Sequence, residues 1–332
     1  MRLHFRLRHA AALALTFAVA FALLLMLPEQ ALAVELRDGF RDGLVGIAAA
    51  DPVWLVVTGL LLAASLAGSA LAWRAALRAC GASCGPVDAV ARYGVGSLAN
   101  ALLPTRVGGV IRIALFSRLV HGEGRVWTTG GAAAVAGIAR SLWLGAVVAL
   151  ASTTGVLPAW PAFVLLAVGC LGIGASLLAL RTRFRARAAH VLDAFGALLR
   201  MPRAACAVML AVGWAIVARV GAATSLALAF DVPRPVAAGL LAVAAIELAA
   251  VLPVGAGGAG MAGGAVAFAL AAHGVAGSVA VSAGMAFAAA EGATAVTVGG
   301  LGGVMLTLPT LARWARRVGR PAVVPQPLPD RI

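Results

Sequence analysis

Leu102-Leu103-Pro104-Thr105-Arg106-Val107-Gly108-Gly109 is the stretch that decides the fold, and Val251-Leu252-Pro253-Val254-Gly255-Ala256-Gly257-Gly258 repeats its pattern. In both, a proline follows an apolar run, and a Gly-Gly pair stands four and five residues after that proline. Inside a membrane, such a break leaves backbone groups without helical partners, which is tolerated only where protein or a polar cavity surrounds them. Matching interruptions in two halves of a chain point to the binding site of a transporter. The alternative is coincidence in a chain with 40 glycines and 15 prolines.

The composition is that of a membrane protein. Of the 332 residues, 62% are hydrophobic and 11% are charged, and the mean hydropathy is +1.01. Several apolar runs reach the roughly 20 residues that a bilayer-spanning helix needs. We therefore expect an all-α polytopic membrane protein with six to eight transmembrane helices and two re-entrant segments broken by proline and glycine. The polar stretches are too short to bury a core, so residues 1–312 are expected to form a single integral membrane domain.

The basic residues are all arginines, 26 in number, and the sequence contains no lysine. A P-loop and a Schiff base each need a lysine, so both are excluded. The net charge of +14 could suggest nucleic acid as a partner. The arginines instead cluster in short loops and tails, as the positive-inside rule requires, and we expect no nucleic-acid binding. Transport would then draw on an ion gradient, a lipid gradient or a separate ATPase.

The apolar runs divide the membrane domain into two pseudo-repeated halves, at about 50–180 and 204–310. The first break lies in a re-entrant pair of half-helices over 89–120. How often the segment 236–308 crosses the membrane stays open. The first apolar run is interpreted as an uncleaved helix, and the alternative is a signal peptide cleaved after Ala31-Leu32-Ala33. The expected full spans are 10–27, 52–73, 127–150, 160–180 and 204–230.

The arginine positions predict the orientation. The loop 181–203 carries six arginines and one aspartate, and we expect it to be cytoplasmic and to lie on the membrane surface as a basic amphipathic segment. The N-terminus and the short tail 313–332 are also rich in arginine and are expected to be cytoplasmic. The acidic segment 28–52 should lie outside. The expected location is the cell (inner) membrane.

Six ionisable residues lie inside apolar runs or beside the first break. They are Arg106, Arg112, Arg140, Arg219, Glu247 and Glu291. Charges at this depth are costly unless they are paired or solvated. One interpretation pairs Arg140 with Glu291, and Arg219 with Glu247, as buried ion pairs that fix packing. The other is a polar cavity in which guanidinium groups bind a phosphate, helped by the positive ends of half-helices.

The candidate substrate-binding residues combine these charges with the residues of the two breaks. They are Asn100, Pro104, Arg106, Gly108, Arg112, Arg140, Arg219, Glu247, Pro253, Gly257, Gly258 and Glu291. No nucleophile stands in a credible catalytic constellation, so we do not expect an enzyme. The four cysteines lack the spacing of a metal site, and we assign no disulfide, metal or cofactor.

The run from Asn100 to Arg112 resembles the N-x-x-x-P-x-R-x-G-x-x-x-R motif of the transmembrane region of lysylphosphatidylglycerol synthases, also called the flippase-like membrane family. Arg140 is similar to the intramembrane arginine of that family, and the segment 253–260 resembles its P-G-G-x-G segment. The resemblance extends over residues 50–310. It implies movement of lipids or lipid-linked glycans between leaflets, or modification of envelope lipids. The soluble domain of the aminoacylating members is not found here, so aminoacyl transfer is not expected.

Three positions depart from the pattern of that family. Gly263 stands where an acidic residue usually follows the P-G-G-x-G segment, and Trp143 stands where an acidic residue often follows the intramembrane arginine. Glu291 occupies a helix that often carries an arginine. These departures indicate that the intramembrane charges are rearranged in this chain.

The leading functional hypothesis is a lipid translocase in cell-envelope biogenesis, which moves a lipid or lipid-linked headgroup between leaflets. Its partner would be a membrane lipid, with an anionic headgroup because arginine favours phosphate. The alternative is a non-transporting membrane partner of an envelope-lipid synthesising or modifying enzyme. A membrane-embedded transferase is the third hypothesis, and the absence of an acid–base set speaks against it. A homo-oligomer is also possible.

Overall fold

The computed structural model describes residues 41, 43–102, 107–122, 124–153, 185–251 and 258–318. All regular secondary structure in these residues is helical, which confirms the all-α class. Several predictions concern segments outside the described residues. These are the expected spans 10–27 and 160–180, most of the acidic segment 28–52, and the breaks themselves at 103–106 and 252–257.

The described helices follow one another along the chain, and residues 154–184, between α6 and α8, lie outside the described residues. They are α3 (Pro52–Ala79), α4 (Pro86–Leu102), α5 (Val107–Ser117), α6 (Arg125–Thr153), α8 (Arg185–Arg200), α9 (Pro202–Ala229), α10 (Pro235–Val251), α11 (Gly258–Ala272) and α12 (Gly277–Val318). Helices α3, α4, α9 and α10 all begin at a proline, whose fixed φ and missing N–H suit the first helical position. At α3 the Asp51 carboxylate also accepts a hydrogen bond from the Val53 N–H at 2.8 Å.

Four helices of the described chain are long and apolar enough to cross a membrane. The qualifying stretches are Pro52–Ala79, Arg125–Ala149, Pro202–Ala229 and Gly277–Leu308. The first three correspond to expected spans. The last lies in the segment whose crossings the sequence left open. The total of six to eight transmembrane helices stays a prediction.

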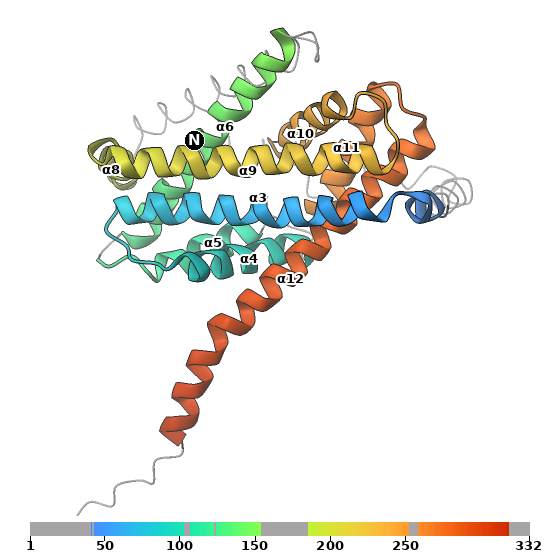
Figure 1. Ribbon diagram of the computed structural model, residues 1–332. Helices are drawn as coiled ribbons and strands as arrows, with labels where there is room; N and C mark the ends of the chain where they lie inside the picture. Colours follow the sequence, from blue (N-terminus) through green and yellow to red (C-terminus); the bar gives the residue numbers. More distant parts are fainter. Residues whose placement is uncertain are drawn as a thin grey trace, which may run out of the picture.

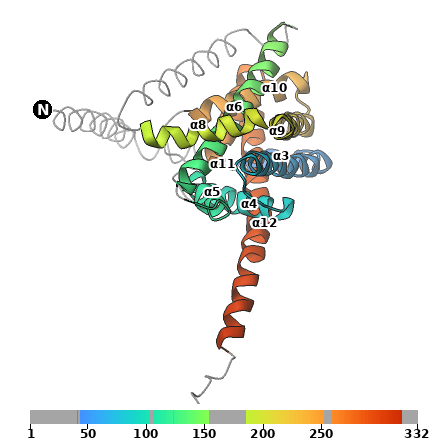
Figure 2. The same cartoon turned by 90° about the vertical axis from the view of Figure 1, so that its left-hand side faces the viewer.

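Helices α3 and α9 lie side by side and antiparallel, as Figures 1 and 2 show from two directions. The hydroxyl of Thr58 contacts that of Ser225 at 2.9 Å, and the Ser65 hydroxyl donates to the Ala215 carbonyl at 2.7 Å. The earlier residue of α3, Thr58, contacts the later residue of α9, and the later Ser65 contacts the earlier Ala215, so the two helices are antiparallel. Small and hydroxyl-bearing side chains allow this close approach, as in other helix pairs inside membranes.

Two pairs of short helices flank this central pair. Helix α4 lies beside α3 and α5 packs against α4, while α10 lies beside α9 and α11 packs against α10 (Figure 1). The four contain 17, 11, 17 and 15 residues. At 1.5 Å per residue each is about 26 Å long or less, which is shorter than the hydrocarbon core of about 30 Å. Residues 103–106 and 252–257 therefore stand between helices that are too short to span a membrane alone.

Helix α12 is the longest element, with 42 residues, and its C-terminal part extends away from the other helices in both views (Figures 1 and 2). It packs along α4 through glycines. A Cβ placed at Gly302 would lie 2.6 Å from the Ala91 carbonyl oxygen, and one at Gly299 would lie 2.5 Å from that of Gly94. The helix continues to Val318, so the first residues of the expected tail are helical.

Most of the arginine-rich loop 181–203 is the helix α8. The side chains of Phe195 and Leu198 pack against a buried cluster formed by α3, α4, α5, α6 and α9. Leu199 is 82% exposed. The segment thus has one apolar face on the helical core, and its position on a membrane surface stays a prediction.

Candidate functional site

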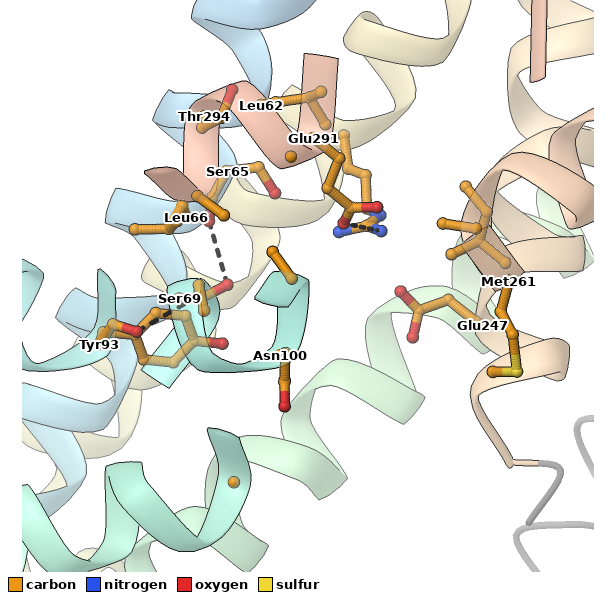
Figure 3. Close-up of a pocket in the computed structure, with 18 of the residues that line it drawn as sticks. Leu62, Ser65, Leu66, Ser69, Tyr93, Asn100, Glu247, Met261, Glu291 and Thr294 are labelled. Carbon is orange, nitrogen blue, oxygen red and sulfur yellow. Dashed lines mark hydrogen bonds and ion pairs between the residues drawn. The ribbon is translucent and has the colours of Figure 1, made fainter. Parts of the chain in front are cut away.

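The described helices other than α8 enclose a cavity of about 480 Å³. Its walls carry five ionisable side chains, which are Arg112, Arg140, Arg219, Glu247 and Glu291. Figure 3 shows the carboxylates of Glu247 and Glu291 directed into the same space from different sides. All the predicted ionisable site residues that the structure describes therefore line the same cavity.

Arg112, on α5, is held against α4. Its Nη2 donates to the Ser97 hydroxyl at 2.8 Å, and its guanidinium lies 4.1 Å from the centroid of the Tyr93 ring. This is a cation–π contact. Gly96 leaves room for the arginine, because a Cβ there would lie 2.8 Å from Arg112 Nε. Among the described residues, no carboxylate lies within ion-pair distance of Arg112.

Arg140, on α6, forms a bidentate ion pair with Glu247 on α10. Its Nε donates to Glu247 Oε2 at 3.0 Å, and its Nη2 donates to Oε1. The two side chains are 28% and 16% exposed. A planar guanidinium matches a carboxylate in this two-point geometry, which fixes the orientation of both groups.

Arg219, on α9, pairs with Glu291 on α12 through Nη2 and Oε1 at 2.9 Å. The interpretation that pairs Arg140 with Glu291, and Arg219 with Glu247, is therefore wrong in its partners. The reason lies in the arrangement of the helices. Helix α6 approaches α10, and α9 approaches α12, whereas the sequence indicates only how deep each charge lies along its own helix.

Three polar atoms in the cavity have no hydrogen-bond partner among the described protein atoms. They are Arg112 Nε, Arg219 Nε and Glu291 Oε2. An unpaired buried donor or acceptor costs free energy, so these atoms favour a bound group that supplies both acceptors and a donor. Three arginines and two glutamates line the cavity, which leaves an excess of one positive charge among its described residues.

Asn100 and Gly108 hold the two sides of the first break together. The Asn100 side-chain oxygen accepts a hydrogen bond from the Gly108 N–H at 2.8 Å, and so caps the start of α5. A Cβ at Gly108 would lie 2.5 Å from Asn100 Cγ, so only glycine fits. Asn100 also lines the cavity, while Gly108 does not. The role of Gly108 is thus to permit the close contact between α4 and α5.

The remaining predicted site residues are at the breaks. Gly258 is the first residue of α11. The others lie outside the described residues, and these are Pro104, Arg106, Pro253 and Gly257.

Two of the departures from the family pattern have a packing role. A Cβ at Gly263 would lie 2.7 Å from the Gly284 carbonyl oxygen on α12, so an acidic side chain cannot be accommodated without moving the helix. The Trp143 indole N–H donates to the Met209 carbonyl at 2.9 Å and joins α6 to α9.

Several cavity residues were not identified from the sequence. They are small hydroxyl-bearing or aromatic side chains, namely Ser65, Ser69, Tyr93, Ser97 and Thr294. Two features of the sequence could have pointed to some of these residues. Ser65 and Ser69 are one helical turn apart and share a face of α3, and Tyr93 is the single tyrosine of the chain.

Comparison with known proteins adds no assignment, because no family model, curated protein or solved structure matches this chain. The resemblance to the flippase-like family therefore stays a prediction. Within the described part of the chain there is also no group of three or more His, Cys, Asp or Glu side chains that could hold a metal ion.

Proposed function

We propose that this protein is a lipid translocase that moves a phosphate-bearing headgroup between the leaflets of the cell membrane. The observation that supports this most is the cavity of about 480 Å³, where apolar helices surround five ionisable side chains. Its size lies in the range of pockets for small ligands, about 300–1,000 Å³. Charges inside a membrane protein are expensive and usually mark a substrate or ion pathway.

In this proposal the headgroup enters the cavity and the acyl chains stay in the surrounding lipid. Arg112 is the primary phosphate contact, because it has no carboxylate partner among the described residues. Arg140 and Arg219 are already neutralised by glutamates and shape the wall of the cavity. The short helices on both sides of the breaks act as re-entrant segments, and their N-terminal ends add positive dipole near the headgroup.

Leaflet exchange in liposomes tests the proposal. Purified protein is reconstituted with a fluorescent phosphatidylglycerol or phosphatidylcholine, and dithionite then bleaches the outer leaflet. We expect wild-type protein to expose inner-leaflet phosphatidylglycerol faster than protein-free liposomes do. Arg112→Gln should lose most of this activity.

Arg118→Gln is the matched control, because it removes the same charge at a nearby exposed position outside the cavity. It should behave as wild type. Well-folded wild-type protein that exchanges neither lipid would contradict the proposal and favour a non-transporting partner of an envelope-lipid enzyme.

A further inference from the structure

The two halves of the described fold contain the same series of elements. A long helix, two short helices separated by a break, and another long helix occur as α3, α4, α5, α6 and again as α9, α10, α11, α12. Helices α3 and α9 both contain 28 residues, and α4 and α10 both contain 17. Because the equivalent helices α3 and α9 run antiparallel, the second half has the inverted orientation of the first.

Some of the cavity residues occupy equivalent places in these two halves. Counted from the proline that begins each helix, Ser69 on α3 and Arg219 on α9 stand at the same position. Arg140 and Glu291 each lie about four helical turns after the start of α6 and α12. A site at the interface of inverted repeats can be reached from both sides of the membrane by a rearrangement of one repeat against the other.

The packing of the two halves is nevertheless unequal. Helix α12 lies close along α4, where Gly94, Gly299 and Gly302 bring the backbones together. The equivalent helices α6 and α10 make far less extensive contact. Their polar link is the ion pair between Arg140 and Glu247. Exchanging the roles of the two halves would produce a second, related arrangement.

The exchange predicts a new partner for Glu291. Counted again from the proline that begins each helix, Glu247 on α10 corresponds to Leu98 on α4. In the exchanged arrangement, Glu291 would face this part of α4 as Arg140 now faces Glu247. Ser97, next to Leu98, holds the guanidinium of Arg112. Both groups have an atom that is unpaired among the described residues, Glu291 Oε2 and Arg112 Nε.

We infer that this protein has a second conformation in which α12 separates from α4, and Glu291 leaves Arg219 to pair with Arg112. The role of this conformation, which is to open the cavity toward the opposite leaflet, rests on the proposed function. Whether the second conformation exists does not depend on that function. Arg112 then has two roles in turn, because it binds the headgroup in one arrangement and Glu291 in the other.

Spin-label distances test the second conformation without reference to transport. Labels at Val87 on α4 and Met305 on α12, which are 58% and 49% exposed, report the separation of these helices. Both labels are introduced as cysteines after the native cysteines have been replaced. We expect two distances in the otherwise wild-type protein, and a loss of at least half of the longer population in Arg112→Gln. Arg112→Lys keeps the charge and should restore it, and Arg118→Gln should leave it unchanged.

A disulfide lock connects the motion to lipid exchange. A Cβ at Gly303 would lie 4.0 Å from a side-chain carbon of Val95, so the pair Val95→Cys and Gly303→Cys can join α4 to α12. Oxidation should reduce exchange at least tenfold, and reduction should restore it. The control pair Gly68→Cys and Ala215→Cys joins α3 to α9, because a Cβ at Gly68 would lie 3.1 Å from the Ala215 Cβ. These helices remain together in both arrangements, so this pair should leave exchange unchanged.

The outcomes separate the two proposals. Lipid exchange that persists in the locked protein, or a single spin-label distance in an active protein, would overturn the second conformation and leave the translocase intact. Two distances that respond to Arg112, in a protein that exchanges no lipid, would support the conformational change and overturn the translocase.

Discussion

Helices α4 and α12 meet through glycine, whereas their counterparts α10 and α6 are linked by an ion pair. At the first contact, Gly299 lies directly against the carbonyl of Gly94 and little can intervene. At the second, Arg140 and Glu247 extend toward each other into a cavity. The difference shows that close backbone packing joins one pair of helices, while long charged side chains join the other pair at the wall of the cavity.

The largest effect is expected when the ion pair between α6 and α10 is broken. Arg140→Met leaves Glu247 partly buried without its partner and should lower the free energy of unfolding by about 3–5 kcal/mol. The double variant Arg140→Met with Glu247→Leu should recover most of this loss, because no uncompensated charge remains. Thermal unfolding in detergent measures both. A single variant as stable as wild type would show that this pair does not hold the interface.

Overpacking of the glycine contact should have the next largest effect. Gly299→Val places a Cβ 2.5 Å from the Gly94 carbonyl oxygen and should destabilise the protein by about 1–3 kcal/mol. Gly300→Val is the matched control, since a Cβ at Gly300 meets no heavy atom within 4 Å. Melting temperatures of the two variants make the comparison. Equal values would mean that α4 and α12 are not in close contact in solution.

A smaller effect is expected at the first break and not at the second. Asn100→Ala removes the acceptor for the Gly108 N–H and should cost about 1 kcal/mol locally. Ala249, at the equivalent place in α10, has no such side chain. Hydrogen exchange should therefore become faster at the start of α5 and stay unchanged at the start of α11. Asn100→Asp keeps the acceptor and should retain slow exchange, and faster exchange at both places would argue against a local cap.

The smallest effect concerns the turn that connects α3 to α4. Burial, together with the neighbouring carboxylate of Asp88, raises the pKa of the Cys84 thiol to about 12. The reactive thiolate is then rare at pH 8, and maleimide should label Cys84 slowly. Asp88→Asn lowers this pKa and should increase the labelling rate at least tenfold in a variant whose other cysteines are replaced. An unchanged rate would mean that limited access, rather than protonation, protects the thiol.

The general architecture could be predicted because membrane insertion leaves a strong signal. Hydropathy located α3, α6 and α9 to within a few residues, and the cost of buried charge identified the five ionisable residues that line the cavity. The Pro/Gly pattern predicts a break after α4 and another after α10, at residues that lie outside the described chain. These signals depend only on residue type and position along the chain.

The pairing of the charges could not be predicted, because it depends on which helices are neighbours. Arg219 and Glu291 lie on α9 and α12, and nothing in their local sequences indicates that these helices meet. The packing role of Gly263 was hidden for the same reason, since it becomes clear only when α12 lies against α11. Polar serines such as Ser97 are too common in membrane helices to be selected before Arg112 is seen to contact them.

The length of α12 gives the cavity a mechanical extension. From Glu291 the helix continues to Val318, with Pro309 in its last part, and at the rise of an α-helix this segment is roughly 40 Å long. If the helix turned by roughly 10° about Glu291, the far end would sweep through about 7 Å, from the same helical rise. A change of ion-pair partner at Glu291 would thus produce a larger displacement at the end of α12 than at Glu291 itself.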